Sequence, residues 1–201
     1  MRPAFLAMAK VQFALEEPFL VAAQVKGILG ITQKQFVYWF SKAIRNVKTD
    51  TRDIDKPTWR RFSVLDLFGF AVLKELRRLR VELSVCERVL AWLRANLTEN
   101  ARLLYPLSDG IRVLVVIDGT TIIHLVGSQT PQRSEVASPS ESSAIHLSLE
   151  PIFRFVLKSA AWKDFHVRFP KNTFGTKTPV SYYVKGERIV LEDVLPEEVL
   201  D

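Results

Sequence analysis

Cysteine and histidine are scarce in this chain of 201 residues, which has one cysteine and three histidines. A single cysteine, Cys86, excludes an intrachain disulfide and a cysteine-rich metal site. His124, His146 and His166 have no carboxylate or cysteine beside them at metal-ligand spacing. We therefore expect no metal site and no other cofactor, and we interpret Cys86 as a small buried hydrophobe.

Sequence motifs of catalysis are missing as well. The sequence has no glycine-rich phosphate loop, no Ser-His-Asp order and no paired-carboxylate motif. Gly119 and Gly186 fall in expected turns instead. We therefore expect a protein that is not an enzyme.

Long apolar runs are absent too. The uncharged runs fall well short of the roughly 20 residues that a membrane-spanning helix needs. The first ten residues combine an arginine, a short apolar patch and a lysine, and no small-residue cleavage site follows them. This pattern does not fit a signal peptide. We expect a cytoplasmic protein, nucleoid-associated if it is a bacterial regulator, with no membrane partner.

Acidic residues are few in the first half of the chain. Residues 1–100 carry 17 Lys and Arg against 10 Asp and Glu, whereas residues 101–201 carry 11 against 12. The net charge of +6 therefore originates in the first half. Cations that neutralise phosphates release counterions, so a polyanionic partner is expected for this half. A merely basic, solubilising surface is the alternative.

The first half has the pattern of two helices joined by a tight turn. Apolar spacing predicts a helix over residues 21–29, which Gly30 ends. Thr32 is the expected cap of a second helix that continues through residue 40. Polar residues 46–57 then predict a loop.

Two further helices are predicted from their caps. Ser63 with Asp66 three residues later resembles a capping box, and Ser84 with Glu87 repeats the arrangement. The apolar residues expected to be buried on these helices are Leu65, Phe68, Val72, Leu76 and Leu79, then Val85, Val89, Leu90 and Leu93.

The second half favours strands. Two β-branched runs around Asp118-Gly119 predict a hairpin, and a second hairpin is expected to turn at Lys185-Gly186. Residues 127–143 predict a loop, and residues 149–161 a short amphipathic helix. We expect an α+β chain of two domains. An all-α winged helix–turn–helix domain at 1–98, with an N-terminal extension at 1–18, precedes a smaller β-rich domain at 104–201.

Four segments of the first half carry a resemblance to a known family. They are Gly30-Ile31-Thr32, Gln35-Phe36-Val37-Tyr38-Trp39, Arg60-Arg61-Phe62-Ser63 with Asp66-Leu67, and Leu83 to Leu90. In order and spacing they resemble the MerR-type helix–turn–helix family over about residues 19–95. The chain departs from the family in Val37, where an arginine is common, and in a longer segment before Arg60. It also lacks the family's long dimerisation helix.

The resemblance implies that the second helix enters the DNA major groove and that a wing touches phosphates. Gln33, Lys34 and Gln35 are then expected at base edges, with Tyr38 at phosphates. We expect Trp39 in the core, and a solvated helix face is the alternative for residues 33–35. The full set of expected DNA-binding residues is Thr32, Gln33, Lys34, Gln35, Tyr38, Lys42, Arg45, Arg60 and Arg61.

These expectations combine into a sequence-specific transcriptional regulator that binds double-stranded DNA. Two half-sites of a palindrome would require a homodimer, and the β-rich half is the expected dimerisation element. That half could otherwise bind an effector or a protein partner. The alternatives are an antitoxin-like or protein-interaction adaptor, and an accessory protein that shapes the DNA of a phage or plasmid.

Overall fold

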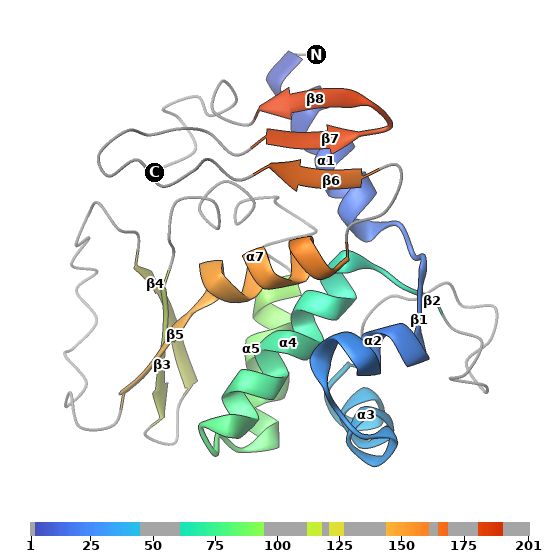
Figure 1. Ribbon diagram of the computed structural model, residues 1–201. Coiled ribbons are helices and arrows are strands. Elements are labelled where there is room, and N and C mark those ends of the chain that lie inside the picture. The colour runs from blue at the N-terminus through green and yellow to red at the C-terminus, as the bar shows by residue number, and fades with distance from the viewer. Residues whose placement is uncertain are drawn as a thin grey trace.

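The computed structural model has an α+β fold that is mostly helical, with a few small antiparallel strand groups (Figure 1). The structure describes residues 3–44, 61–94, 112–117, 121–126, 144–160, 165–168 and 181–190. The loops predicted over residues 46–57 and 127–143 lie outside these ranges.

The helices that the structure describes are α1 (Pro3–Glu16), α2 (Ala22–Leu29), α3 (Gln33–Trp39), α4 (Val64–Arg78), α5 (Leu83–Arg94) and α7 (Leu149–Ser159). A π-helical segment, η1 (Phe40–Ile44), continues α3. The strands are β1 (Leu20–Val21), β2 (Arg61–Phe62), β3 (Arg112–Ile117), β4 (Thr121–Val126), β5 (Ala144–Ser148), β6 (Phe165–Arg168), β7 (Ser181–Val184) and β8 (Glu187–Val190).

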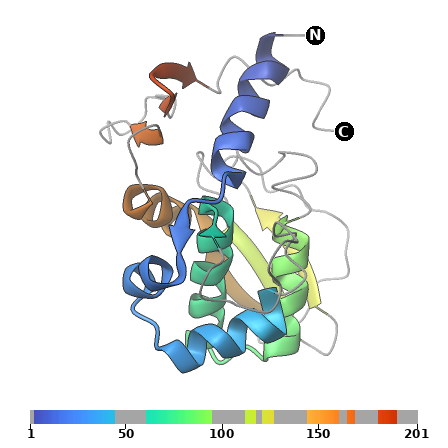
Figure 2. The ribbon, with the colours of Figure 1, turned by 90° about the vertical axis from the view of Figure 1, so that its right-hand side faces the viewer.

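Helix α4 is the centre of the fold. It packs against α1, α2, α5 and α7, and Figure 2 shows it between α5 and α7. The single apolar stripe predicted for it is too narrow, because Val64, Leu67, Phe70, Ala71 and Leu73 are buried as well as Phe68, Val72 and Leu76. A helix that is apolar around most of its surface is a buried helix. The predicted Leu65 and Leu79 are only partly buried.

The predicted start of α4 is confirmed, whereas that of α5 is wrong. Ser63 Oγ accepts a hydrogen bond from the Asp66 backbone N–H at 3.1 Å, and an Asp66 carboxylate oxygen accepts one from the Ser63 backbone N–H at 2.9 Å. In α5, the helix begins at Leu83, so Ser84 lies inside the first turn and does not precede it. The four apolar residues predicted to face inward from α5 are all buried.

Two three-stranded antiparallel sheets occur in the described part of the second half, with strand orders β4-β3-β5 and β6-β7-β8. Both predicted hairpins are confirmed in their strands, although Asp118-Gly119 lies outside the described residues. In the second hairpin Lys185 has φ 49° and Gly186 has φ 84°. Positive φ at both turn residues matches the twist of paired strands. Strands β5 and β6 are not anticipated by the sequence patterns above.

Both halves of the chain contribute to one core. Helix α7 confirms the predicted amphipathic helix, and Phe153 on it meets Phe68 of α4 edge-on, with ring centroids 5.2 Å apart. Helix α1 was not predicted within the N-terminal extension. It contacts α4, β7 and β8, and Lys10 forms an ion pair with Glu187 at 2.8 Å. The expected boundary between residues 98 and 104 lies outside the described ranges and stays a prediction.

Candidate nucleic-acid interface

Four phenylalanine rings fix α3 against its neighbours. Phe36 of α3 stacks on Phe70 of α4 at a centroid distance of 5.1 Å and meets Phe62 of β2 edge-on at 5.6 Å. Phe40 of η1 packs edge-on against Phe62 at 6.1 Å. We call Phe36, Phe40, Phe62 and Phe70 the aromatic cluster. Stacked and edge-on ring pairs stabilise beyond the area they bury, so the cluster holds α3 in one orientation.

The turn before α3 is specified locally. Gly30 ends α2 with φ +61°, a left-handed conformation that favours glycine. Thr32 Oγ1 accepts a hydrogen bond from the Gln35 backbone N–H at 3.2 Å, and the Gln35 side-chain oxygen accepts one from the Thr32 backbone N–H at 2.9 Å. Thr32 and Gln35, both predicted to contact DNA, are thus exposed residues that form the helix cap.

Lys34, Val37 and Tyr38 form what we call the outer face of α3. Residues three and four apart lie on one side of a helix, and all three are exposed, Val37 at 42% and Tyr38 at 52%. The opposite side carries the buried Phe36 and Trp39, which confirms the expected core position of Trp39. Val37 on this face was not predicted, although its spacing of three residues from Lys34 was readable in the sequence.

Gln33 borders the outer face and is tied to α2. The Lys26 ammonium donates a hydrogen bond to the Gln33 side-chain oxygen at 2.5 Å. A glutamine that binds adenine bidentately needs both its carbonyl oxygen and its amide nitrogen. Lys26 uses one of the two lone pairs of this oxygen, and the amide N–H groups of Gln33 can donate to an acceptor such as purine N7.

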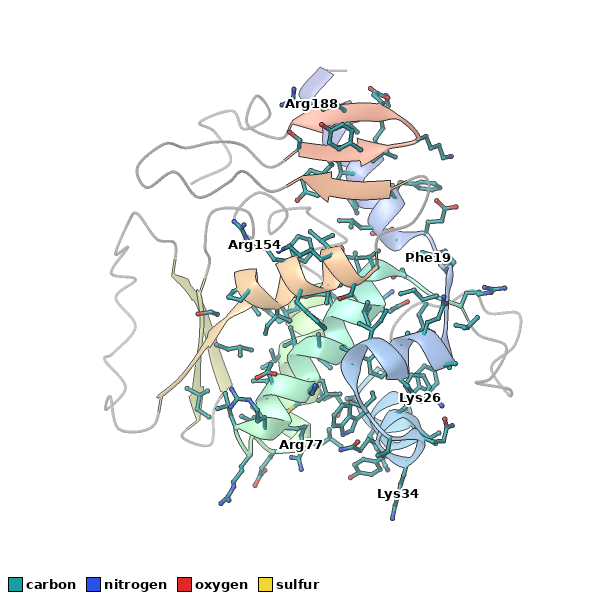
Figure 3. The ribbon with its side chains drawn as sticks, viewed as in Figure 1. Phe19, Lys26, Lys34, Arg77, Arg154 and Arg188 are labelled. Atoms are coloured by element: carbon teal, nitrogen blue, oxygen red, sulfur yellow. The ribbon has the colours of Figure 1, made fainter. Side chains whose placement is uncertain are left out.

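The segment that carries α2 and α3 has cations and lacks acids. The sequence has no acidic residue between Glu17 and Asp50, and Lys26, Lys34 and Lys42 fall within this stretch. Lys34 and Lys42 are exposed, and Figure 3 shows Lys34 pointing away from the body of the protein. The positive charge of the segment is therefore not neutralised from within it.

A short strand pair links the start of α2 to the start of α4. The first half is therefore not all-α, which differs from the prediction. Leu20 lies opposite Phe62 and Val21 opposite Arg61 in an antiparallel register. The exposed Arg61 side chain donates a hydrogen bond from Nη1 to the Phe19 carbonyl at 3.2 Å. Arg45 and Arg60, the other arginines expected at DNA, lie outside the described residues.

A second cationic group at the end of α4 was missed by the sequence reasoning. Arg77 and Arg78 are exposed in its last turn, and the exposed Arg80 follows with φ 63°. One turn earlier, the Lys74 ammonium donates to the Leu29 carbonyl at 2.7 Å and so connects α4 to the end of α2. Figure 3 shows Arg77 toward the same end of the molecule as Lys34. The Arg-Arg-Leu-Arg run was the available signal.

Cys86 is buried in α5, as expected. Its thiol lies 3.7 Å from the Val81 carbonyl. Burial raises the pKa of the Cys86 thiol to about 11, against smaller opposite effects of Arg77 and of a backbone hydrogen bond. A thiol with a raised pKa is a poor nucleophile at neutral pH. In the part of the chain that the structure describes, no group of three or more His, Cys, Asp or Glu residues could hold a metal ion.

The comparisons with known proteins give no assignment of family. No protein-family model matches the sequence, and searches of curated proteins and of solved structures return no match. Within the described residues, no helix has the length and apolar character needed to cross a membrane.

Proposed function

We propose that this protein is a sequence-specific DNA-binding regulator that inserts the outer face of α3 into the major groove. The observation that carries the proposal is the division of α3 into two sides. Phe36 on its inner side packs within the aromatic cluster, whereas its outer side exposes Lys34, Val37 and Tyr38. The B-DNA major groove, about 12 Å wide, admits one α-helix.

Three further features support this proposal. The segment that carries α3 has lysines and no acidic residue, which favours approach to phosphates. Gly30 and the Thr32 cap set α3 at a defined angle to α2, as helix–turn–helix recognition requires. The pairing of β1 with β2 places Arg61 beside this unit, in accord with the wing that the MerR-type resemblance implies.

The proposed contacts divide into two kinds. Lys34 and the amide of Gln33 read base edges, because both donate to the acceptors of a purine. Tyr38, Arg61 and the arginines at the end of α4 bind phosphates, which fixes the register without reading sequence. Lys42 adds to this second group.

The proposed assembly is a homodimer on a palindromic site. One α3 covers a single half-site, and two half-sites are read when two copies bind about one helical turn apart. The β-rich second half is the proposed dimerisation element, since α4, α5 and their neighbours supply no long coiled coil in the described residues.

Selection of genomic fragments by the full-length protein tests the proposal, followed by titration of one selected duplex by fluorescence anisotropy. We expect saturable binding to a palindrome and much weaker binding to a scrambled duplex. Equal affinity for both duplexes would instead support the DNA-shaping alternative. Absence of binding to any duplex at low salt rejects the proposal.

A further inference from the structure

The valine on the outer face of α3 is the least expected residue of the candidate interface. Val37 is 42% exposed and lies between Lys34 and Ser41 along the helix. Single exposed apolar residues are common on protein surfaces, so exposure alone carries no meaning. The position of Val37 carries meaning, because Val37 lies on the side of α3 that the proposed function directs at DNA.

A valine has a restricted set of partners in the major groove. Its side chain has no hydrogen-bond donor or acceptor, so it cannot pair with the polar groups of the bases. The C5-methyl group of thymine is the apolar group that the bases expose there. Val37 is branched at Cβ and therefore stiff in a helix, so it offers a methyl group at a well-defined place on α3.

The residues around Val37 do not cover its side chain, which can therefore contact a thymine methyl group. Phe36 is buried against Phe70, which fixes the direction of the α3 outer face. The Gln33 oxygen is held by Lys26, and the Gln35 oxygen is held by the Thr32 cap. The oxygen of Gln35 also accepts from the Thr32 hydroxyl, so both of its lone pairs are used within the cap.

We propose that Val37 reads the C5-methyl group of a pyrimidine, supplied by a thymine in the bound half-site. This contact rests on the proposed function, because it requires α3 in the major groove. It adds a specificity that Lys34 cannot supply, since an ammonium group does not distinguish thymine from uracil by the methyl group.

The test uses the full-length protein, one selected duplex, and the same duplex with every thymine replaced by uracil. One buried methyl group is worth about fourfold in affinity, so a homodimer that makes the contact in both half-sites should bind the uracil duplex about 15-fold more weakly. Val37→Ala should reduce this ratio, because alanine retains only the Cβ methyl group. Lys34→Ala is the matched control: it should weaken binding to both duplexes and still prefer the thymine duplex.

Each outcome of these titrations supports or refutes the contact between Val37 and thymine. If the wild-type protein binds thymine and uracil duplexes equally, or if Val37→Ala keeps the ratio, the contact is refuted while DNA binding stands. If no duplex is bound, the contact and the proposed function both fail. If 5-methylation of the cytosines raises wild-type affinity about fourfold for each half-site and thymine replacement has no effect, the methyl group comes from 5-methylcytosine and not from thymine.

Discussion

Helices α3 and α7 pack on opposite sides of α4, and each makes its contact through a phenylalanine. Phe70 of α4 stacks on Phe36 of α3, whereas Phe68 meets Phe153 of α7. Residues two apart on a helix of 3.6 residues per turn project about 200° apart. One buried helix thus supports two elements that come from different halves of the chain.

The two supported helices differ in what they leave exposed. The outer face of α3 lies in a lysine-bearing segment without acidic residues. Helix α7 exposes Phe155 at 46% and Lys158, and it runs directly from β5 of a three-stranded sheet. The exposed face of α3 is the one that the proposed function assigns to DNA, whereas α7 joins the second half to the helical core.

The largest expected effect comes from removing a ring on either side of α4. Phe70→Ala and Phe153→Ala should each lower the free energy of unfolding by roughly 3–5 kcal/mol, because each leaves a cavity in the shared core. Urea titration followed by tryptophan fluorescence and circular dichroism measures both changes.

Phe155→Ala is the matched control for Phe153→Ala, since it removes the same ring from an exposed position of the same helix. Its effect should stay within about 1 kcal/mol. If Phe153→Ala leaves the main transition unchanged and only creates a second one, the two halves do not share a cooperative core.

A smaller effect is expected on DNA affinity from the exposed cations. Lys34→Ala should weaken binding and discrimination between duplexes, because Lys34 is assigned to base edges. The double variant Arg77→Ala with Arg78→Ala should weaken binding to every duplex, and each lost phosphate contact should reduce the salt slope by about 0.9. Anisotropy titrations over a range of salt concentrations give this slope.

Lys158→Ala removes an exposed cation from α7 and should leave both the affinity and the slope unchanged. An equal loss from Lys158→Ala would mean that charge alone drives binding, and the contrast between α3 and α7 would be lost.

Removal of the two helix caps should have comparable effects on stability and different effects on binding. Thr32→Ala and Ser63→Ala each delete a side-chain acceptor, at a cost of about 1 kcal/mol. Only Thr32→Ala should also reduce DNA affinity, because it loosens the start of α3. Ser41→Ala, an exposed hydroxyl within η1, is the control and should change stability by less than about 0.5 kcal/mol.

Cys86 is expected to add a pH dependence of stability that is confined to alkaline conditions. Its pKa is raised to about 11 in the folded protein, so the folded state holds the thiol proton more tightly than the unfolded state does. The associated stability is present below the ordinary thiol pKa and is lost as pH rises toward 11. Urea titrations between pH 8 and about 11 should show a steeper decline for the wild-type protein than for Cys86→Ala; parallel declines would contradict it.

Local sequence signals predicted the helix starts and hairpin turns with mixed success. The Ser63 and Thr32 caps were readable because the bonding groups lie three residues apart. The α5 start was placed wrongly, since Ser84 fits the cap pattern but lies within the first turn. Helix α1 was missed because its apolar residues do not form one clear stripe, and only its contacts with α4 and β7 select a buried side.

The candidate site was partly predictable, because some of its residues are related by helical spacing within a few positions of one another. Helical spacing from Lys34 was enough to group Lys34 with Tyr38. The hydrogen bonds that occupy the oxygens of Gln33 and Gln35, and the exposure of Val37, depend on how α3 sits against α2 and α4. The DNA-binding role itself stays a prediction.

By itself the sequence determined the charge asymmetry, the caps and the turn at Lys185-Gly186, because these depend on residues close together in the chain. Only the tertiary structure decided that Leu20 pairs with Phe62 and that α4 is covered on both sides. Such contacts join residues far apart in sequence, and their choice depends on which apolar surfaces fit together when the whole chain is packed.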